Sequence, residues 1–249
     1  YEINRENIMC KIFIFDVDGT LTPSRRTMTP EFEDFFYMWS KGKKYYLVSG
    51  SDLPKMKEQV GVLYLSRAQG IFCCGGNQFY DQPFEKLIYE NKFKVPENLL
   101  TYLGEELRMT DYPVKAGNHI EDRGSMLNFS IVGRNCTQTQ REDYYRYDKL
   151  VGERKRISKY IREQWRDLDA VIGGQISIDI VPKGFDKSQV IKHIEEREQV
   201  SEFIFVGDRT EKGGNDYPLA HLLENRDNGV VYQTTDWRET MKFLGENYG

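Results

Sequence analysis

A short apolar run near the amino end, Lys11–Phe15, leads directly into the string Asp16-Val17-Asp18-Gly19-Thr20. The run contains β-branched and aromatic residues, which is typical of a buried strand. Two carboxylates at the end of such a strand are unfavourable in an apolar core, but they suit a hard divalent cation. Ligands of open α/β sheets bind beyond the carboxyl ends of the strands, so the string predicts a metal-dependent site there.

Strands and helices alternate in the first third of the chain and again after Pro182. Thr29 and Pro30 open a helix, as the N-cap and the first helical residue. This alternation predicts a parallel sheet with crossover helices. The other expected strands are 44–48, 70–73, 203–206 and 230–232, and the other expected helices are 53–59, 187–195, 217–223 and 237–247.

The middle of the chain lacks this alternation. It indicates a hairpin of strands 78–80 and 87–89 around an Asp-Gln-Pro turn, then helices at 99–109, 138–149 and 154–165 and strands at 126–131, 170–172 and 176–180. Such a mixture is typical of an α+β domain. We therefore expect a parallel-sheet core from residues 1–81 and 185–249, with an α+β domain from residues 82–184 inserted into it.

Five further residues occupy positions suited to phosphate chemistry. Asp208 follows the strand 203–206 and offers the metal another carboxylate, while Asn215 and Asp216 could orient the metal's ligands. Ser51, after the second strand, has a hydroxyl that can donate to a phosphoryl oxygen. Lys187 begins a helix, where its ammonium can neutralise both a phosphate and a nucleophile.

Composition narrows the classes of function. The chain has 249 residues and a formal net charge of −4, which gives no support to a general nucleic-acid binder. No apolar stretch reaches the length of a membrane span. Residues 1–9 are polar and charged, without an apolar signal region, so a cytoplasmic protein is expected.

The order of these groups resembles the haloacid-dehalogenase superfamily. The resemblance implies a Rossmann-like core with an inserted cap domain, and Mg²⁺ as the cofactor. It assigns Asp16 as the nucleophile and Asp18 as the general acid and base, with Ser51 and Lys187 as further catalytic residues. The implied metal ligands are Asp16, Asp18 and Asp208.

Longer strings make the chain similar to eukaryotic-type phosphomannomutases over nearly its whole length. They include Met126-Leu127-Asn128, Gly173-Gly174-Gln175-Ile176-Ser177 and Gly213-Gly214-Asn215-Asp216. The resemblance implies that a hexose phosphate is bound by Arg25, Arg123, Arg134, Arg141, Ser177 and Asp179.

The implied reaction interconverts mannose 6-phosphate and mannose 1-phosphate, a step of GDP-mannose biosynthesis. Asp16 is phosphorylated by a hexose 1,6-bisphosphate activator, and Asp18 moves the proton. Arginines of the inserted domain would hold the phosphate that does not react. The resemblance also implies a homodimer formed through the inserted domain.

Three alternatives stay open from the sequence. A sugar-phosphate phosphatase would use the same core, with water attacking the aspartyl phosphate. A nucleic-acid binder could use Arg154-Lys155-Arg156 and Arg162, which lie near three tyrosines. A catalytically inactive scaffold is disfavoured because every core motif residue is present.

Overall fold

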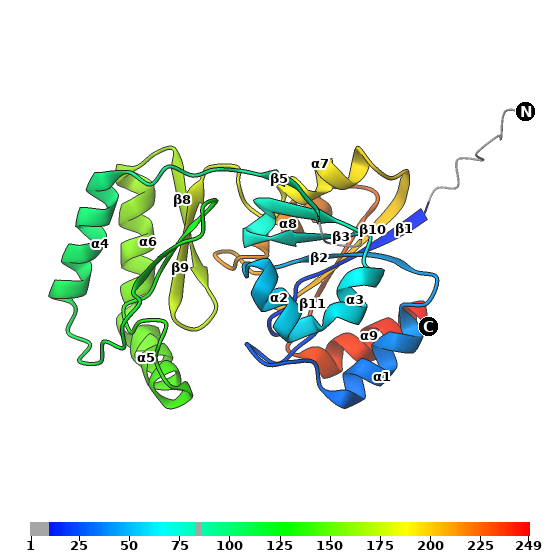
Figure 1. The fold of residues 1–249 in the computed structure, drawn as a ribbon, viewed down its shortest axis with the longest axis horizontal. Coiled ribbons are helices and arrows are strands. Elements are labelled where there is room, and N and C mark those ends of the chain that lie inside the picture. Colours follow the sequence, from blue (N-terminus) through cyan, green and yellow to red (C-terminus); the bar gives the residue numbers. More distant parts are fainter. Residues whose placement is uncertain (1–9, 83–85) are drawn as a thin grey trace, which may run out of the picture. The chain divides into compact units, whose positions relative to one another are not determined.

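The protein divides into two compact units in a computed structural model that describes residues 10–82 and 86–249 (Figure 1). Unit 1 takes in the described residues up to Tyr89, together with Lys187–Lys212 and Asp216–Gly249. Unit 2 consists of Glu90–Asp186 and Gly213–Asn215. Residues 1–9, which carry the argument against a signal peptide, lie outside the described residues.

Unit 1 is built on a seven-stranded sheet with the strand order β11-β10-β1-β2-β3-β4-β5. The first five strands in this order pair in parallel, and β4 is antiparallel to β3. The predicted parallel sheet is therefore confirmed. The strands are β1 (Cys10–Phe15), β2 (Lys44–Val48), β3 (Gly70–Cys73), β4 (Gln78–Asp81), β5 (Lys86–Glu90), β10 (Val200–Gly207) and β11 (Gly229–Gln233).

Helices cover both faces of this sheet (Figure 1). Residues of α7 and α8 join one apolar cluster with β1, β2, β3 and β10, whereas α1, α3 and α9 pack their aromatic rings and backbone against the other face. Burial on both faces explains why these strands are continuous apolar runs. The helices are α1 (Pro30–Trp39), α2 (Leu53–Val60), α3 (Val62–Arg67), α7 (Gln189–Glu195), α8 (Tyr217–Glu224) and α9 (Trp237–Tyr248).

Helix α1 begins as its sequence predicts. The Thr29 side chain accepts a hydrogen bond from the backbone N–H of Phe32, and Pro30 occupies the first turn. The apolar side of the helix then contributes Phe36 and Trp39, whose rings pack edge-on against Phe15. This cluster fixes β1, and with it the position of Asp16.

The boundary of the core differs from the predicted one. We expected the inserted domain to begin at residue 82, but β5 is the edge strand of the core sheet. The hairpin continues the sheet because β4 pairs with β3, where the rings of Phe72 and Phe79 lie 4.6 Å apart. The prediction relied on strand–helix alternation, and an antiparallel hairpin breaks that alternation, so β5 was not assigned to the core sheet. The predicted turn lies partly outside the described residues.

Unit 2 is an α+β structure with a four-stranded antiparallel sheet in the order β6-β7-β9-β8. The apolar cluster under its helices includes Leu127, Phe129, Ile178 and Ile180 from the two central strands. Because side chains alternate along a strand, the intervening residues face the opposite side of the sheet. The elements are α4 (Glu97–Met109), β6 (Ile120–Asp122), β7 (Leu127–Phe129), α5 (Gln138–Val151), α6 (Glu153–Gln164), β8 (Leu168–Gly173) and β9 (Ser177–Pro182).

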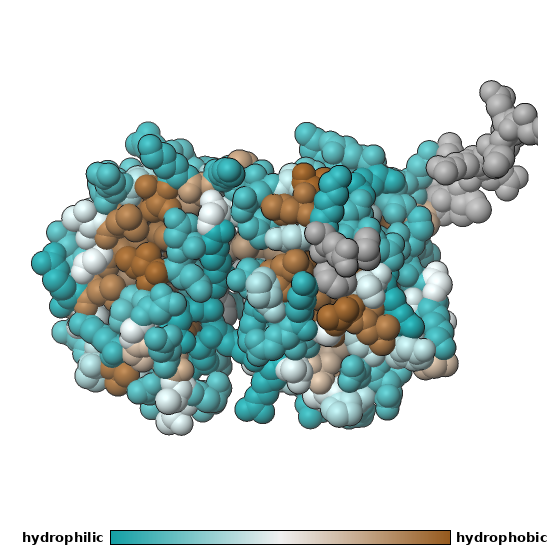
Figure 2. Space-filling view, viewed as in Figure 1, coloured by the Kyte–Doolittle hydropathy of each residue, from teal (hydrophilic) through white to brown (hydrophobic). Residues whose placement is uncertain are grey.

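Within residues 10–82 and 86–249, no helix is both long enough and apolar enough to cross a membrane. Figure 2 shows a largely hydrophilic visible surface with apolar areas on each unit.

Candidate active site

Three carboxylates gather at the carboxyl end of the core sheet. Asp16 follows β1, and its backbone N–H donates to the carbonyl of Val206 on the parallel strand β10 at 3.0 Å. One carboxylate oxygen each from Asp16, Asp208 and Asp216 lies within 4.8 Å of the other two. Gly19 permits this approach, since a Cβ there would lie 2.5 Å from Oδ2 of Asp208.

Lys187 neutralises part of this charge. Its Nζ donates to Oδ1 of Asp16 at 2.5 Å and to Oδ1 of Asp216 at 2.6 Å, and its side chain is 2% exposed. The hydroxyl of Thr20 donates to the other oxygen of Asp16 at 3.2 Å. A surface position for Lys187 is therefore excluded.

Burial and the nearness of the other carboxylates raise the pKa values of Asp16 and Asp208. Burial, and then the charge of Asp216, raises the pKa of Asp16 to about 7. Burial and the charge of Asp16 raise the pKa of Asp208 to about 9. Burial alone would lower the pKa of Lys187, but the two carboxylates that it contacts raise it above its ordinary value.

The cluster suits a divalent cation. Three carboxylates with oxygens this close, two of them bonded to the ammonium of Lys187, concentrate negative charge that a hard cation would neutralise. Carboxylate oxygens are also the ligands that Mg²⁺ prefers. The group includes Asp16 and Asp208 of the predicted ligands, and it adds Asp216, which we expected only to orient other ligands.

Asp18 is held apart from this group by hydrogen bonds of its own. Its Oδ1 accepts from the backbone N–H of Arg25 at 2.7 Å and from Nε2 of the buried Gln59 at 2.7 Å. Arg25 has a positive φ of 61°, which is uncommon outside glycine and shows a constrained turn. Because Oδ1 already accepts two donors, Oδ2 is the oxygen suited to carry a proton. Gln59 carried no recognisable signal in the sequence.

The predicted hydroxyl site lies in the loop after β2. The backbone N–H of Ser51 donates to the hydroxyl oxygen of Ser49 at 3.0 Å, and its carbonyl accepts from Cys74 at 2.9 Å. Strand β2 is the parallel neighbour of β1, so Asp16 and Ser51 follow adjacent strand ends.

An arginine cluster lies in unit 2, around the polar side chain of Glu121. Arg123 donates to Oε2 of Glu121 through Nε at 3.0 Å and Nη2 at 2.6 Å, and Nε of Arg134 lies 3.7 Å from the same oxygen. Burial, and then the charge of Arg123, lowers the pKa of Arg134. Two guanidinium groups this near one another are suited to bind a phosphate.

Neighbouring strands add polar groups to this cluster. Nη1 of Arg134 donates to Oγ of Ser177 at 3.2 Å, and Nδ2 of Asn128 donates to Oδ1 of Asp179 at 2.5 Å. Asn128 and Asp179 are paired across β7 and β9, on the side of the sheet away from its apolar cluster. Gly173 leaves room for this carboxylate, since a Cβ there would lie 2.4 Å from its Oδ2.

The last predicted arginine of unit 2, Arg141, is buried at the start of α5, and its Nη2 lies 3.7 Å from Sγ of Cys136. Its charge and that of Asp179 both act on the Arg134 guanidinium. The structure thus brings Arg123, Arg134, Arg141, Ser177 and Asp179 together, while Arg25 belongs to unit 1.

The basic side chains proposed for nucleic-acid binding are engaged elsewhere. Arg154 is 3% exposed and pairs with Asp148. Arg156 makes two hydrogen bonds to Glu106, and Arg162 donates to the carbonyl of Ala170. Each of these three arginines is therefore bonded to a carboxylate or carbonyl of the protein itself.

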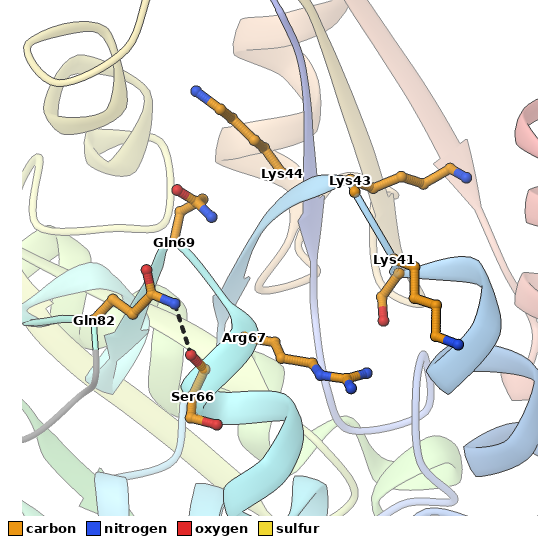
Figure 3. Close-up of a pocket in the computed structure, with 9 residues that line it drawn as sticks. Lys41, Lys43, Lys44, Ser66, Arg67, Gln69 and Gln82 are labelled. Carbon is orange, nitrogen blue, oxygen red and sulfur yellow. Dashed lines mark hydrogen bonds between the residues drawn. The ribbon is translucent and has the colours of Figure 1, made fainter.

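A separate pocket of about 460 Å³ lies at the other end of the core sheet (Figure 3). It is formed before β2 and β3, whereas Asp16 follows the carboxyl end of β1. Figure 3 shows the Lys43 and Lys44 side chains diverging, and Lys44 is paired with Glu198 at 2.7 Å. We do not assign catalysis to this pocket.

Comparison with known proteins supports the interpretation of the sequence. The family model for eukaryotic phosphomannomutase matches residues 32–246. The chain belongs to the eukaryotic phosphomannomutase family. A phosphomannomutase from Drosophila melanogaster is 38% identical, with 84% of this chain and 85% of that protein covered. Phosphomannomutase 1 from Dictyostelium discoideum is 35% identical, with 94% and 95% covered.

The fold of this phosphomannomutase family member is similar to solved structures with the haloacid-dehalogenase fold. The C-terminal domain of trehalose-6-phosphate phosphatase from C. albicans has a TM-score of 0.64 at 15% identity, covering 96% of this chain and 91% of that chain. A haloacid dehalogenase-like hydrolase from Bacteroides thetaiotaomicron has a TM-score of 0.58 at 15% identity, covering 96% and 100%. The predicted fold class is confirmed.

Proposed function

We propose that the protein is a phosphomannomutase, which interconverts mannose 6-phosphate and mannose 1-phosphate through a phosphorylated Asp16. Family membership supports this activity. The observation that carries the proposal is the arginine cluster of Arg123 and Arg134, bridged by Glu121 in unit 2. A phosphatase needs only one phosphate site, whereas a mutase also has to hold the phosphate that does not react.

In the first step, an oxygen of Asp16 attacks the phosphorus of a hexose 1,6-bisphosphate, and the bond from phosphorus to the sugar oxygen breaks. Asp18 gives the departing oxygen a proton from Oδ2. In the second step, the free hydroxyl of a bound hexose monophosphate, on C1 of mannose 6-phosphate or C6 of mannose 1-phosphate, loses its proton to the same oxygen and takes the phosphoryl group from Asp16. This forms mannose 1,6-bisphosphate and frees Asp16, which then takes the bisphosphate's other phosphoryl group and leaves the isomeric monophosphate. Lys187 neutralises charge that develops beside Asp16.

A bound Mg²⁺, for which Asp16, Asp208 and the backbone carbonyl of Asp18 are the proposed ligands, would supply positive charge beside the phosphoryl oxygens. The close approach of Asp216 to this group supports its inclusion in the same site. Ser51 is the proposed donor to a phosphoryl oxygen.

Unit 2 is the proposed cap, with Arg141, Ser177 and Asp179 as further contacts to the hexose phosphate and Arg25 contributing from unit 1. A homodimer through the cap is also proposed. Exposed large apolar residues on its helices support this proposal, and they are Leu100, Met109, Leu150, Val151 and Tyr160. A cytoplasmic location and a place in GDP-mannose biosynthesis stay predictions.

The activity is tested by incubating the protein with Mg²⁺, mannose 1-phosphate and a trace of glucose 1,6-bisphosphate. Phosphorus NMR should show mannose 6-phosphate with little free phosphate, and Asp16→Asn should abolish its formation. Mostly free phosphate would replace the mutase with the alternative, a sugar-phosphate phosphatase on the same fold.

A further inference from the structure

Arg154, near the start of α6, is a buried arginine that the proposed reaction does not use. Its side chain is 3% exposed. Its Nε donates to Oδ2 of Asp148 at 2.8 Å, and its own backbone N–H donates to Oδ1 of the same carboxylate at 2.8 Å. Asp148 therefore fixes both the backbone and the guanidinium of Arg154.

The remaining hydrogen bonds of this guanidinium reach the turn between β8 and β9. Nη1 of Arg154 donates to the carbonyl of Gly174 at 3.0 Å and to that of Ser177 at 3.3 Å. These two carbonyls flank the turn. Gly173 and Gly174 give this turn wide backbone freedom, and Gly174 has a positive φ of 50°. A fixed donor that binds both of its ends removes that freedom.

The far side of the same turn faces the arginine cluster. The Ser177 carbonyl accepts from Arg154, while its hydroxyl accepts from Arg134 at 3.2 Å. A continuous set of charge-assisted hydrogen bonds thus runs from Asp148 through Arg154 and Ser177 to Arg134.

We propose that Arg154 is a positioning residue for hexose-phosphate binding. It holds Gly174–Ser177 so that the hydroxyl of Ser177 and the guanidinium of Arg134 meet the sugar phosphate with fixed geometry. This inference rests on the proposed function, since it takes Arg134 and Ser177 as substrate contacts. Arg154 itself does not touch the substrate.

Arg154→Lys tests the proposal, because lysine retains a cation beside Asp148 but lacks the planar fork that binds Asp148 and both carbonyls together. The matched control is Arg156→Lys on the same helix. Arg156 is bonded to Glu106 at 2.9 and 2.5 Å and has a side chain that is 59% exposed.

We expect Arg154→Lys to raise the KM for mannose 1-phosphate by about tenfold or more, as the loss of hydrogen bonds to a charged group implies. Hydrogen exchange at the Gln175–Ser177 amides should become faster. The rate at which acetyl phosphate, a donor without a sugar, phosphorylates Asp16 should stay unchanged. Arg156→Lys should match the wild type in all three measurements.

Two results would overturn the proposal. One is an Arg154→Lys protein with wild-type KM and wild-type exchange at the turn. The other is an equal loss of sugar turnover and acetyl phosphate reactivity with a lower melting temperature, which would mean a general role in stability. If the wild type lacked mutase activity, hydrogen exchange with and without mannose 6-phosphate would still test whether Arg154 orders the turn for sugar-phosphate binding.

Discussion

Lys187 illustrates how one residue ties the site together. Its ammonium lies between Asp16 and Asp216, with less than a twentieth of the side chain exposed. An isolated charge at this depth would be strongly unfavourable, so its presence requires both carboxylates. The same contacts place the positive charge where a phosphoryl group on Asp16 would need it.

Replacing this lysine should remove catalysis more than binding. We expect Lys187→Met to lower kcat by about 10²–10³-fold, the usual effect of losing one group that stabilises transition-state charge. Lys192→Met is the control, because Lys192 is an exposed residue of α7, the helix that follows Lys187, and lies 4.0 Å from Glu196. Initial rates with saturating mannose 1-phosphate measure the effect, and equal rates for the two variants would contradict it.

Glu121 has a comparable role among the arginines of unit 2. Glu121→Gln removes the charge that holds Arg123 and Arg134 near one oxygen, so we expect KM for mannose 1-phosphate to rise by about tenfold. Steady-state kinetics measure this, with Glu105→Gln as an exposed control on α4. Tighter binding in Glu121→Gln would instead mean that the carboxylate competes with phosphate.

At the scale of elements, the ends of the strands could be predicted from the sequence, but contacts between residues distant in the sequence could not. Apolar runs that end in polar strings located Asp16, Ser51 and Asp208, because parallel strands are buried on both faces and their ends are not. The three-residue strand β6 was missed, since it is too short to show a period. The partner of Asp18, Gln59, comes from a helix 41 residues away, and such proximity depends on packing.

The tip of the β8–β9 hairpin offers a test at this scale. Gly173→Ala should displace Asp179 from Asn128, because the new Cβ would lie 2.4 Å from a carboxylate oxygen. We expect about tenfold weaker binding of mannose 6-phosphate, as for one lost charge-assisted hydrogen bond, measured by calorimetry. Unchanged binding in Gly173→Ala would contradict the proposed role of Asp179 in binding the hexose phosphate.

The control is Gly104→Ala within α4, where a new Cβ would have no atom within 4 Å. This substitution should stabilise the protein by roughly 0.5–1 kcal/mol without affecting binding.

For the whole molecule, the acidic cluster links stability to pH and to metal. Burial and the charge of Asp16 raise the pKa of Asp208 in the fold from its ordinary 3.8 to about 9, so between these pH values the folded state retains a proton that the unfolded state loses. Without metal, this group therefore lowers stability progressively as pH rises from about 4 to about 9.

Asp208→Asn should remove that dependence. In EDTA, we expect the melting temperature of the wild type to fall relative to the variant as pH rises through this window. Added Mg²⁺ should raise the wild-type value more than that of the variant, because the cation neutralises the carboxylates. If the melting temperatures of the two proteins differed by the same amount at all pH values, with or without Mg²⁺, the carboxylate cluster would not link stability to pH or to the metal.

The fate of the phosphoryl group on Asp16 tests the central claim most directly. The protein would be phosphorylated with a stoichiometric amount of labelled glucose 1,6-bisphosphate in Mg²⁺, freed of sugar, and then mixed with mannose 6-phosphate for a single turnover. We predict label on the peptide that contains Asp16, followed by its transfer to the sugar as mannose 1,6-bisphosphate. Release of the label as inorganic phosphate, at the same rate with or without the sugar, would contradict a mutase and leave a phosphatase.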